Sequence, residues 1–231
     1  MNTAKIIAVT QPIISQHGNI GHNEPLMTVD EFIAYVARVS NPSNQNNTLT
    51  ASKLLKYLAK HKHWSPFEMV DVVMEINTTR DIGRQVIRHR SFSFQEFSQR
   101  YADPTGDLGF STREARLQDH KNRQNSIETD DKTLQKEWED RQMTIRDTVL
   151  DVYEWAIENG IAKEQARAVL PEGLTNSRMY MNGTLRSWVH YCQLRSGPET
   201  QKEHREIALD AWYQITEQFP SLKDALDLGE K

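Results

Sequence analysis

The sequence of 231 residues has little cysteine and no long apolar run. Cys192 is its only cysteine, which excludes an intramolecular disulfide and a cysteine-based metal cluster. No apolar stretch approaches the roughly 20 residues that a membrane helix needs. The first twelve residues hold too few apolar side chains for a signal peptide. We therefore expect a cytoplasmic protein with no membrane partner.

The chain also lacks an excess of positive charge and the common nucleotide-binding loops. Its 28 lysines and arginines face 32 aspartates and glutamates, a net charge of −4 that argues against a nucleic-acid partner. Neither a G-x-G-x-x-G nor a Walker A sequence occurs, so no Rossmann or P-loop site is predicted. His61 and His63 have no evident third ligand, so no metal site is predicted. Length and composition suit a single globular domain, residues 1–231.

What the sequence does contain is a local concentration of arginine. Residues 80–101 carry five arginines and no lysine, with Asp81 and Glu96 as the only acids, so this segment has a formal charge of +3. Arginine without lysine suits planar, bidentate recognition of phosphate or carboxylate. The part "RHRSFSFQEFSQRY" (88–101) is also aromatic, and burying charge there is costly. Charge-assisted hydrogen bonds to a bound dianion, about 1.5–3 kcal/mol each, would offset that cost.

The patterning predicts an α/β (α+β) fold that is rich in helix. A capping box at 28–31 starts one helix, a polar stretch at 103–131 predicts a long loop or lid, and a second capping box at 200–203 starts the last helix. The remaining predicted elements are strands at 5–9 and 69–79 and helices around 54–58, at 81–88, 132–159, 163–171 and 183–195. No domain boundary is evident apart from the polar stretch.

Two local patterns in the arginine-rich segment suggest ligand contacts. On a helix, Gln85 and Arg88 share one face, where an amide and a guanidinium suit a base edge; the alternative is a basic helix end at the surface. If residues 92–100 are extended, Glu96, Ser98 and Arg100 share one face, and Glu96 supports Arg88 or Arg100. Ser98 as a nucleophile is less favoured, because His89 is the only histidine near it in sequence.

The predicted helix 183–195 has a polar stripe beside an apolar one. Arg186, His190 and Gln193 follow at helical spacing, and Arg195 ends the helix. A solvated face with Arg195 stabilising the helix dipole is the alternative interpretation. Cys192 falls on the apolar side, so we expect it to serve packing.

Taken together, these segments resemble the flavin-dependent thymidylate synthases. The resemblance rests on "RHR" followed by seven residues and a serine (88–98), on "ARAVLP" (166–171) and on "LRSWVHYCQLR" with "TQKEHREIA" (185–208), and it extends from about residue 30 to the end. It implies a thymidylate synthase-complementing protein-like fold, with a central sheet flanked by long helices. It also implies reductive methylation of dUMP to dTMP, with FAD as cofactor, and NADPH and 5,10-methylenetetrahydrofolate as co-substrates. The expected assembly is a homotetramer whose active sites are shared between subunits.

The resemblance also implies roles for individual residues. Flavin contacts are expected from Ser65, Arg88, His89, Arg90, Glu96, Thr184, Leu185, Arg186 and His190. Contacts with dUMP are expected from Gln85, Arg88, Glu96, Ser98, Arg100, Arg167 and Arg195, with Arg195 as the catalytic group that activates the uracil. Gln95, His190 and Met69 depart from the residues usual in the family at these places.

Two other classes of protein were weighed from the same residues. One is a non-catalytic nucleotide- or RNA-binding module that uses the arginine and phenylalanine side chains of 88–101. The other is a structural helical oligomer, which leaves the arginine cluster without a role. A flavin spectrum in the purified protein separates the enzyme from both.

Overall fold

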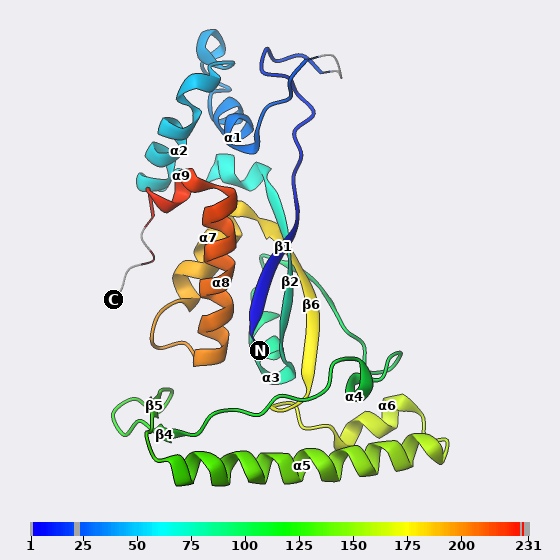
Figure 1. Ribbon diagram of the computed structural model, residues 1–231. Helices are drawn as coiled ribbons and strands as arrows, with labels where there is room; N and C mark the ends of the chain where they lie inside the picture. Colours follow the sequence, from blue (N-terminus) through cyan, green and yellow to red (C-terminus); the bar gives the residue numbers. More distant parts are fainter. Residues whose placement is uncertain (1, 21–23, 227, 229–231) are drawn as a thin grey trace.

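The computed structural model describes residues 2–20, 24–226 and 228, and its centre is an antiparallel sheet (Figure 1). The sheet has four strands in the order β1-β2-β6-β3. Their bounds are Thr3–Val9 (β1), Asp71–Thr79 (β2), Asn176–Thr184 (β6) and Ser93–Glu96 (β3). The predicted mixed, helix-rich fold with a central sheet is confirmed.

Two helices cover one face of this sheet. These are α7 (Leu185–Arg195) and α8 (Lys202–Gln218), and both lie along the strands in Figure 1. Trp188 of α7 is fully buried and donates its indole N–H to the carbonyl oxygen of Val72 at 2.9 Å. Cys192 is fully buried on the same helix, in agreement with its predicted packing role.

The helices at one end of the sheet are short. They are α1 (Val29–Ala37), α2 (Ala51–Lys60) and α9 (Pro220–Lys223), with 3₁₀ turns η1 (Pro42–Asn44), η2 (Thr48–Thr50) and η3 (Ser65–Met69) between or beside them. The predicted capping box of α1 is confirmed: Glu31 N–H donates to the Thr28 hydroxyl, and the Thr28 N–H donates to the Glu31 carboxylate.

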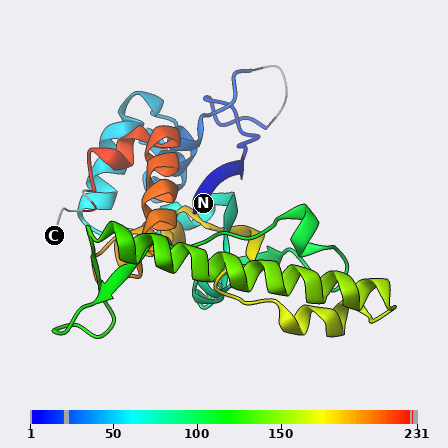
Figure 2. The ribbon, with the colours of Figure 1, turned by 60° about the horizontal axis from the view of Figure 1, so that its bottom comes forward.

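The long helix α5 (Lys132–Glu158) crosses the other end of the sheet (Figures 1 and 2). Near it lie α3 (Arg80–Val86), α4 (Pro104–Asp107), α6 (Lys163–Ala166), η4 (Arg167–Val169) and the hairpin of β4 (Arg116–Gln118) and β5 (Ser126–Glu128). The stretch 103–131, predicted as a loop, thus contains a short helix and a hairpin. None of the helices in the described part of the chain has the length and apolar character of a membrane span.

Some predicted element boundaries were wrong, and elements outside the 103–131 stretch were missed as well. The helix expected to be capped by Asp81 starts at Arg80 and ends at Val86. The expected capping box at 200–203 is absent, because the Glu203 carboxylate pairs with Arg116 and α8 has no side-chain cap. Strand β6 and helix α9 were not predicted, although β6 lies between β2 and β3 in the sheet.

Candidate functional site

The first group of predicted site residues lies around the start of α7. The Thr184 hydroxyl caps this helix by accepting the Ser187 N–H. Arg186 forms an ion pair with Glu68 of η3 at 2.5 Å, and the His190 ring lies edge-on to Trp64 with centroids 5.0 Å apart. Ser65 is exposed at the start of the same turn, and Leu185 is buried. We call Ser65, Thr184, Leu185, Arg186 and His190 the turn group.

The second group lies at the other end of α7. The Arg195 Nε–H donates to Nε2 of His89 at 3.0 Å, which requires that nitrogen to be unprotonated. Burial, and then the charge of Arg195, lower the pKa of His89 to about 4, so the imidazole is neutral at physiological pH. Arg88 and Arg90 flank His89 with exposed side chains. Together with Gln85, these residues form the core group.

Glu96 lies near this group but pairs with different arginines than predicted. Its carboxylate lies 3.5 Å from Arg80 and 3.4 Å from Arg84, and it accepts the hydroxyl of Ser177 at 2.9 Å. The predicted support of Arg88 or Arg100 by Glu96 is therefore wrong. Arg80 and Arg84 lie one turn apart on α3, and that face meets the end of β3.

The third group lies beside α6. Arg100 Nε is 3.8 Å from the Glu164 carboxylate, and Arg167 Nε–H donates to the Glu164 carbonyl oxygen at 3.3 Å. The Ser98 hydroxyl accepts the Arg100 backbone N–H at 3.4 Å, because the chain turns after β3 instead of staying extended to residue 100. We call Ser98, Arg100 and Arg167 the outer group. Both ribbon views place α6 at the opposite end of α5 from α7 and α8 (Figures 1 and 2).

Several arginines of these groups lack internal counter-charges. Within residues 2–20, 24–226 and 228, no carboxylate forms an ion pair with Arg88, Arg90, Arg167 or Arg195. Guanidinium groups of this kind are suited to bind phosphate or another anion.

The sequence interpretation missed polar residues that contact the core group. Gln201 accepts an N–H of the Gln85 amide at 2.8 Å, and the fully buried His204 lies 3.4 Å from the same amide through Nδ1. Tyr191 packs its ring edge-on to His89, with centroids 4.9 Å apart. The signal was their spacing: Gln201 and His204 are three residues apart at the start of α8, which places both on the side that faces α3.

The fold and these groups define a mixed α and β protein with arginine-rich sites for anionic ligands. Residues 26–221 match the family described as "Thymidylate synthase complementing protein". The chain belongs to this family, that of the flavin-dependent thymidylate synthases.

Individual relatives support the assignment. The chain is 46% identical over 225 residues to a probable flavin-dependent thymidylate synthase of Paramecium bursaria Chlorella virus 1, covering 97% of this chain and 99% of the relative. It is 46% identical over 223 residues to a flavin-dependent thymidylate synthase of Synechocystis sp., covering 96% and 98%. The predicted class of enzyme, a methyltransferase that converts dUMP to dTMP, is confirmed.

Among solved structures, the fold is similar to a UMP/dUMP methylase, PolB from Streptomyces cacaoi bound with 5-Br dUMP. The TM-score is 0.75 and the identity 21%, and the alignment covers 97% of this chain and 94% of the other.

Proposed function

We propose that the chain binds FAD and dUMP in its arginine-rich groups and makes dTMP with 5,10-methylenetetrahydrofolate as carbon donor and NADPH as reductant. The observation that carries the proposal is the absence of internal counter-ions for Arg88, Arg90 and Arg195 in the described part of the chain. Exposed or half-buried guanidinium groups that no carboxylate occupies are available to bind an anionic ligand. FAD contributes a diphosphate and dUMP a phosphate.

The residues present fit a flavin dinucleotide. Arg88 and Arg90 are exposed cations that suit its diphosphate, and His89 lies between them in sequence. The turn group offers a capped helix start with Arg186, His190 and the exposed Ser65. When bound, FAD supplies the hydride of the reaction. The protein's own residues hold it and align it with the pyrimidine.

The core group also accounts for activation of the pyrimidine. A guanidinium beside the N3/O4 edge of uracil favours the form in which N3 is ionised. Arg195 is suited to this role because neutral His89 accepts from its Nε and leaves its terminal nitrogens available. The chemistry needs no enzyme thiol, and Cys192 is buried with a raised pKa.

The outer group and Glu96 are assigned to the dUMP phosphate and sugar. Glu96 lies near the core group, whereas the outer group lies beside α6, away from α7 in one chain. We propose that a homotetramer brings the outer group of one subunit to the core group of another. An exposed apolar stripe on α5 supports such assembly, since its side chains are 37 to 58% exposed: Leu134, Trp138, Ile145, Val152 and Trp155. Each chain then acts as one domain, residues 1–231.

The departures from the usual family residues fall at accessible places. Gln95 and Met69 are exposed, and His190 is half-buried against Trp64. Burial, followed by the charge of Arg186, lowers the pKa of His190, so its ring is neutral and retains one donor and one acceptor.

Release of tritium from [5-³H]dUMP tests the function. We expect FAD-loaded protein to release tritium and form dTMP only with both NADPH and methylenetetrahydrofolate. Arg195→Ala should retain FAD and lose turnover, whereas His17→Leu, an exposed histidine far from the groups in sequence, should behave as the parent. A colourless protein that shifts an RNA probe would instead support the RNA-binding alternative.

A further inference from the structure

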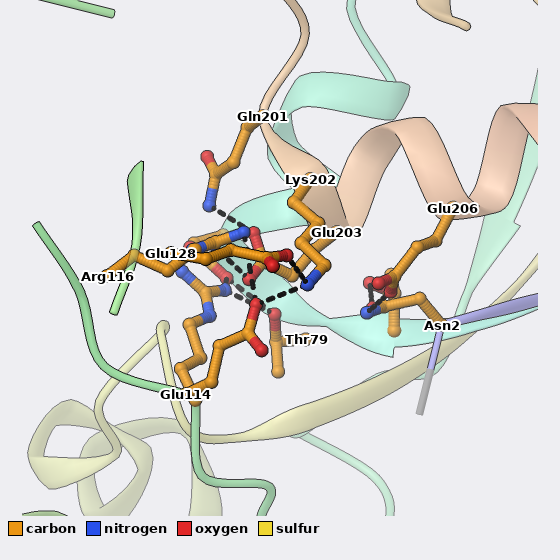
Figure 3. Close-up of polar contacts among 12 residues, drawn as sticks. Asn2, Thr79, Glu114, Arg116, Glu128, Gln201, Lys202, Glu203 and Glu206 are labelled. Atoms are coloured by element: carbon orange, nitrogen blue, oxygen red, sulfur yellow. Dashed lines mark hydrogen bonds and ion pairs between the residues drawn. The ribbon is translucent and has the colours of Figure 1, made fainter. Parts of the chain in front are cut away.

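A series of hydrogen-bonded polar side chains, which we call the hydrogen-bond chain, connects the β4–β5 hairpin to the core group. It starts at Glu203, whose carboxylate accepts from Arg116 at 2.5 Å and from the Gln201 amide at 2.9 Å (Figure 3). The Gln201 amide oxygen then accepts an N–H of Gln85 at 2.8 Å. Three elements, β4, α8 and α3, are joined by these contacts.

The chain continues from Gln85 into the core. The Gln85 amide oxygen lies 3.4 Å from Nδ1 of His204, and Nε2 of His204 lies 3.1 Å from the Tyr191 hydroxyl. His204 is fully buried and Tyr191 is 2% exposed, so water does not compete with these contacts. No role in the proposed reaction has been given to either residue.

The direction of every hydrogen bond in the hydrogen-bond chain follows from the carboxylate of Glu203 at its start. Burial raises the pKa of Glu203, but hydrogen bonds from Arg116, the backbone and Gln201 lower it further than burial raises it. An ionised carboxylate only accepts, so Gln201 must turn its NH₂ to Glu203 and its oxygen to Gln85. Gln85 must then donate to Gln201 with its NH₂.

The same reasoning determines which ring nitrogen of His204 carries the proton. Because the Gln85 oxygen faces His204, Nδ1 must carry the proton and donate. Nε2 is then the acceptor, and the Tyr191 hydroxyl must donate to it. A neutral ring is required, and burial, followed by the charge of Arg195, keeps it neutral by lowering its pKa to about 3.

We propose that His204, held by Tyr191, is a positioning residue that fixes the amide orientation of Gln85 for nucleotide binding. Gln201 sets which end of the Gln85 amide faces it, and Nδ1 of His204 holds the oxygen end, so without His204 that end of the amide is free to tilt. The fixed orientation keeps the second N–H of Gln85 free to donate to an oxygen of the nucleotide. This inference rests on the proposed function, because it takes dUMP as the ligand that Gln85 contacts.

A double-mutant cycle on FAD-loaded protein tests whether His204 acts through Gln85. The measurement is the Kd of dUMP by calorimetry for His204→Leu, Gln85→Ala and the double variant. We expect His204→Leu alone to weaken binding about tenfold, the worth of one hydrogen bond. In the Gln85→Ala background the same change should have less than about a twofold effect. Additive losses would overturn the proposal, because a general packing defect does not need Gln85.

Rescue by a conservative variant provides the second arm. His204→Asn retains an amide N–H near the position of Nδ1, so dUMP affinity should return to within about threefold of the parent. His204→Gln places its amide nearer Nε2 and should not rescue. His17→Leu is the matched control for loss of a histidine. A His204→Asn variant as weak as His204→Leu, at equal FAD content, would also overturn the proposal.

The histidine tautomer gives a readout that does not need the ligand. In protein labelled with ¹⁵N-histidine, the shifts of His204 should report a neutral ring protonated on Nδ1, assigned by loss of the signal in His204→Asn. Protonation on Nε2 would overturn the hydrogen-bond chain itself. If the parent protein binds FAD but not dUMP, the proposed function fails. Measuring the tautomer of His204 still tests the hydrogen-bond chain in that case.

Discussion

At the scale of single residues, the core group combines charged arginine with neutral histidine. His89 and His204 have ring centroids 6.1 Å apart, and the pKa of each is lowered by burial and then by the charge of Arg195. A neutral imidazole can accept from a guanidinium, whereas an imidazolium would repel it. Both rings stay neutral in the folded protein but can bind a proton once the protein unfolds, so the free energy of unfolding depends on pH.

The pH dependence of stability follows from the lowered pKa of His204. As pH falls from about 6.5 toward 3, the unfolded chain binds a proton that the folded chain does not, so the free energy of unfolding falls. Between pH 7 and pH 5, this site should cost the parent about 2 kcal/mol. Urea unfolding at both pH values should show a smaller loss for His204→Gln, which cannot titrate. Equal losses in parent and variant would show that His204 is protonated in the folded protein.

The buried cysteine allows a second prediction at this scale. Burial raises the pKa of the Cys192 thiol, and its side chain is fully enclosed on α7. We expect Cys192→Ala to keep the turnover of the parent while losing about 1 kcal/mol of stability through a small cavity. Steady-state kinetics and thermal unfolding measure the two effects. Lost turnover in a folded, FAD-loaded variant would restore a thiol to the mechanism.

At the scale of elements, strand β6 holds the arginine-rich segment in place. A Cβ atom at Gly183 would lie 2.4 Å from the Phe92 ring. Phe92 packs edge-on against Trp188, with ring centroids 4.9 Å apart. The glycine therefore lets the segment that follows Arg88–Arg90 approach the sheet.

Gly183→Ala should displace this segment. We expect reduced FAD content and a thermal midpoint lowered by several degrees, consistent with an overpacking cost of about 1–3 kcal/mol. Gly173→Ala is the matched control, because nothing lies within 4 Å of a Cβ there. Absorbance at 450 nm per mole of protein measures FAD content. Similar FAD content in the two variants would mean that Phe92 can move without disturbing the site.

The elements also show how far sequence reasoning reached. Helices with a continuous apolar stripe or a capping box, such as α1 and α7, were predicted close to their true bounds. β6 was missed because its sequence, "NSRMYMNGT", has no valine or isoleucine, and its buried positions hold serine, methionine and glycine. Pairing with β2 on one side and β3 on the other decides its conformation, and the local sequence does not show which strands pair with it.

The site residues also divide into those that sequence reasoning identified and those whose contacts it could not predict. The family resemblance implied His89 as a flavin contact and Arg195 as the group that activates the uracil, and the structure brings the two side chains into contact. The pairing of Glu96 with Arg80 and Arg84 could not be predicted, because the strand ends at Glu96 and the chain then turns. Contacts between elements far apart in sequence, such as Gln85 with Gln201, need the packing of α3 on α8.

The apolar stripe of α5 makes a prediction about assembly. Ile145 is 49% exposed in the middle of this stripe, and Ile145→Lys places a charge in the proposed interface. We expect the variant to elute with the mass of one or two chains, measured by light scattering. Glu154→Lys is the control, since this exposed residue lies on the other flank of the helix. Unchanged mass for Ile145→Lys would place the tetramer contact elsewhere.

At the scale of the whole molecule, the separation of the outer group from the core group is the basis for our proposal that sites are shared between chains. The outer group lies beside α6, and both ribbon views place α6 at the opposite end of α5 from α7, which ends at Arg195 (Figures 1 and 2). A symmetric assembly can bring different patches of two copies together.

Mixed oligomers test this sharing. Arg195→Ala and Arg167→Ala should each be inactive alone, because each removes one part of every site. After co-expression, a random mixture contains sites with both residues intact, so activity should return to about a quarter of the parent value. Activity per FAD in a doubly tagged, purified mixture is the measurement. No recovery would mean that each chain supplies both residues to its own site.

Helix α7 carries Arg186 of the turn group near its start and Arg195 of the core group at its end. At a rise of 1.5 Å per residue, Arg186 and Arg195 are about 14 Å apart along a single rigid rod. In the proposed function Arg186 contacts FAD and Arg195 contacts dUMP, so one rigid helix links the two ligand sites of each chain. Displacing α7 at either end would therefore change both sites together.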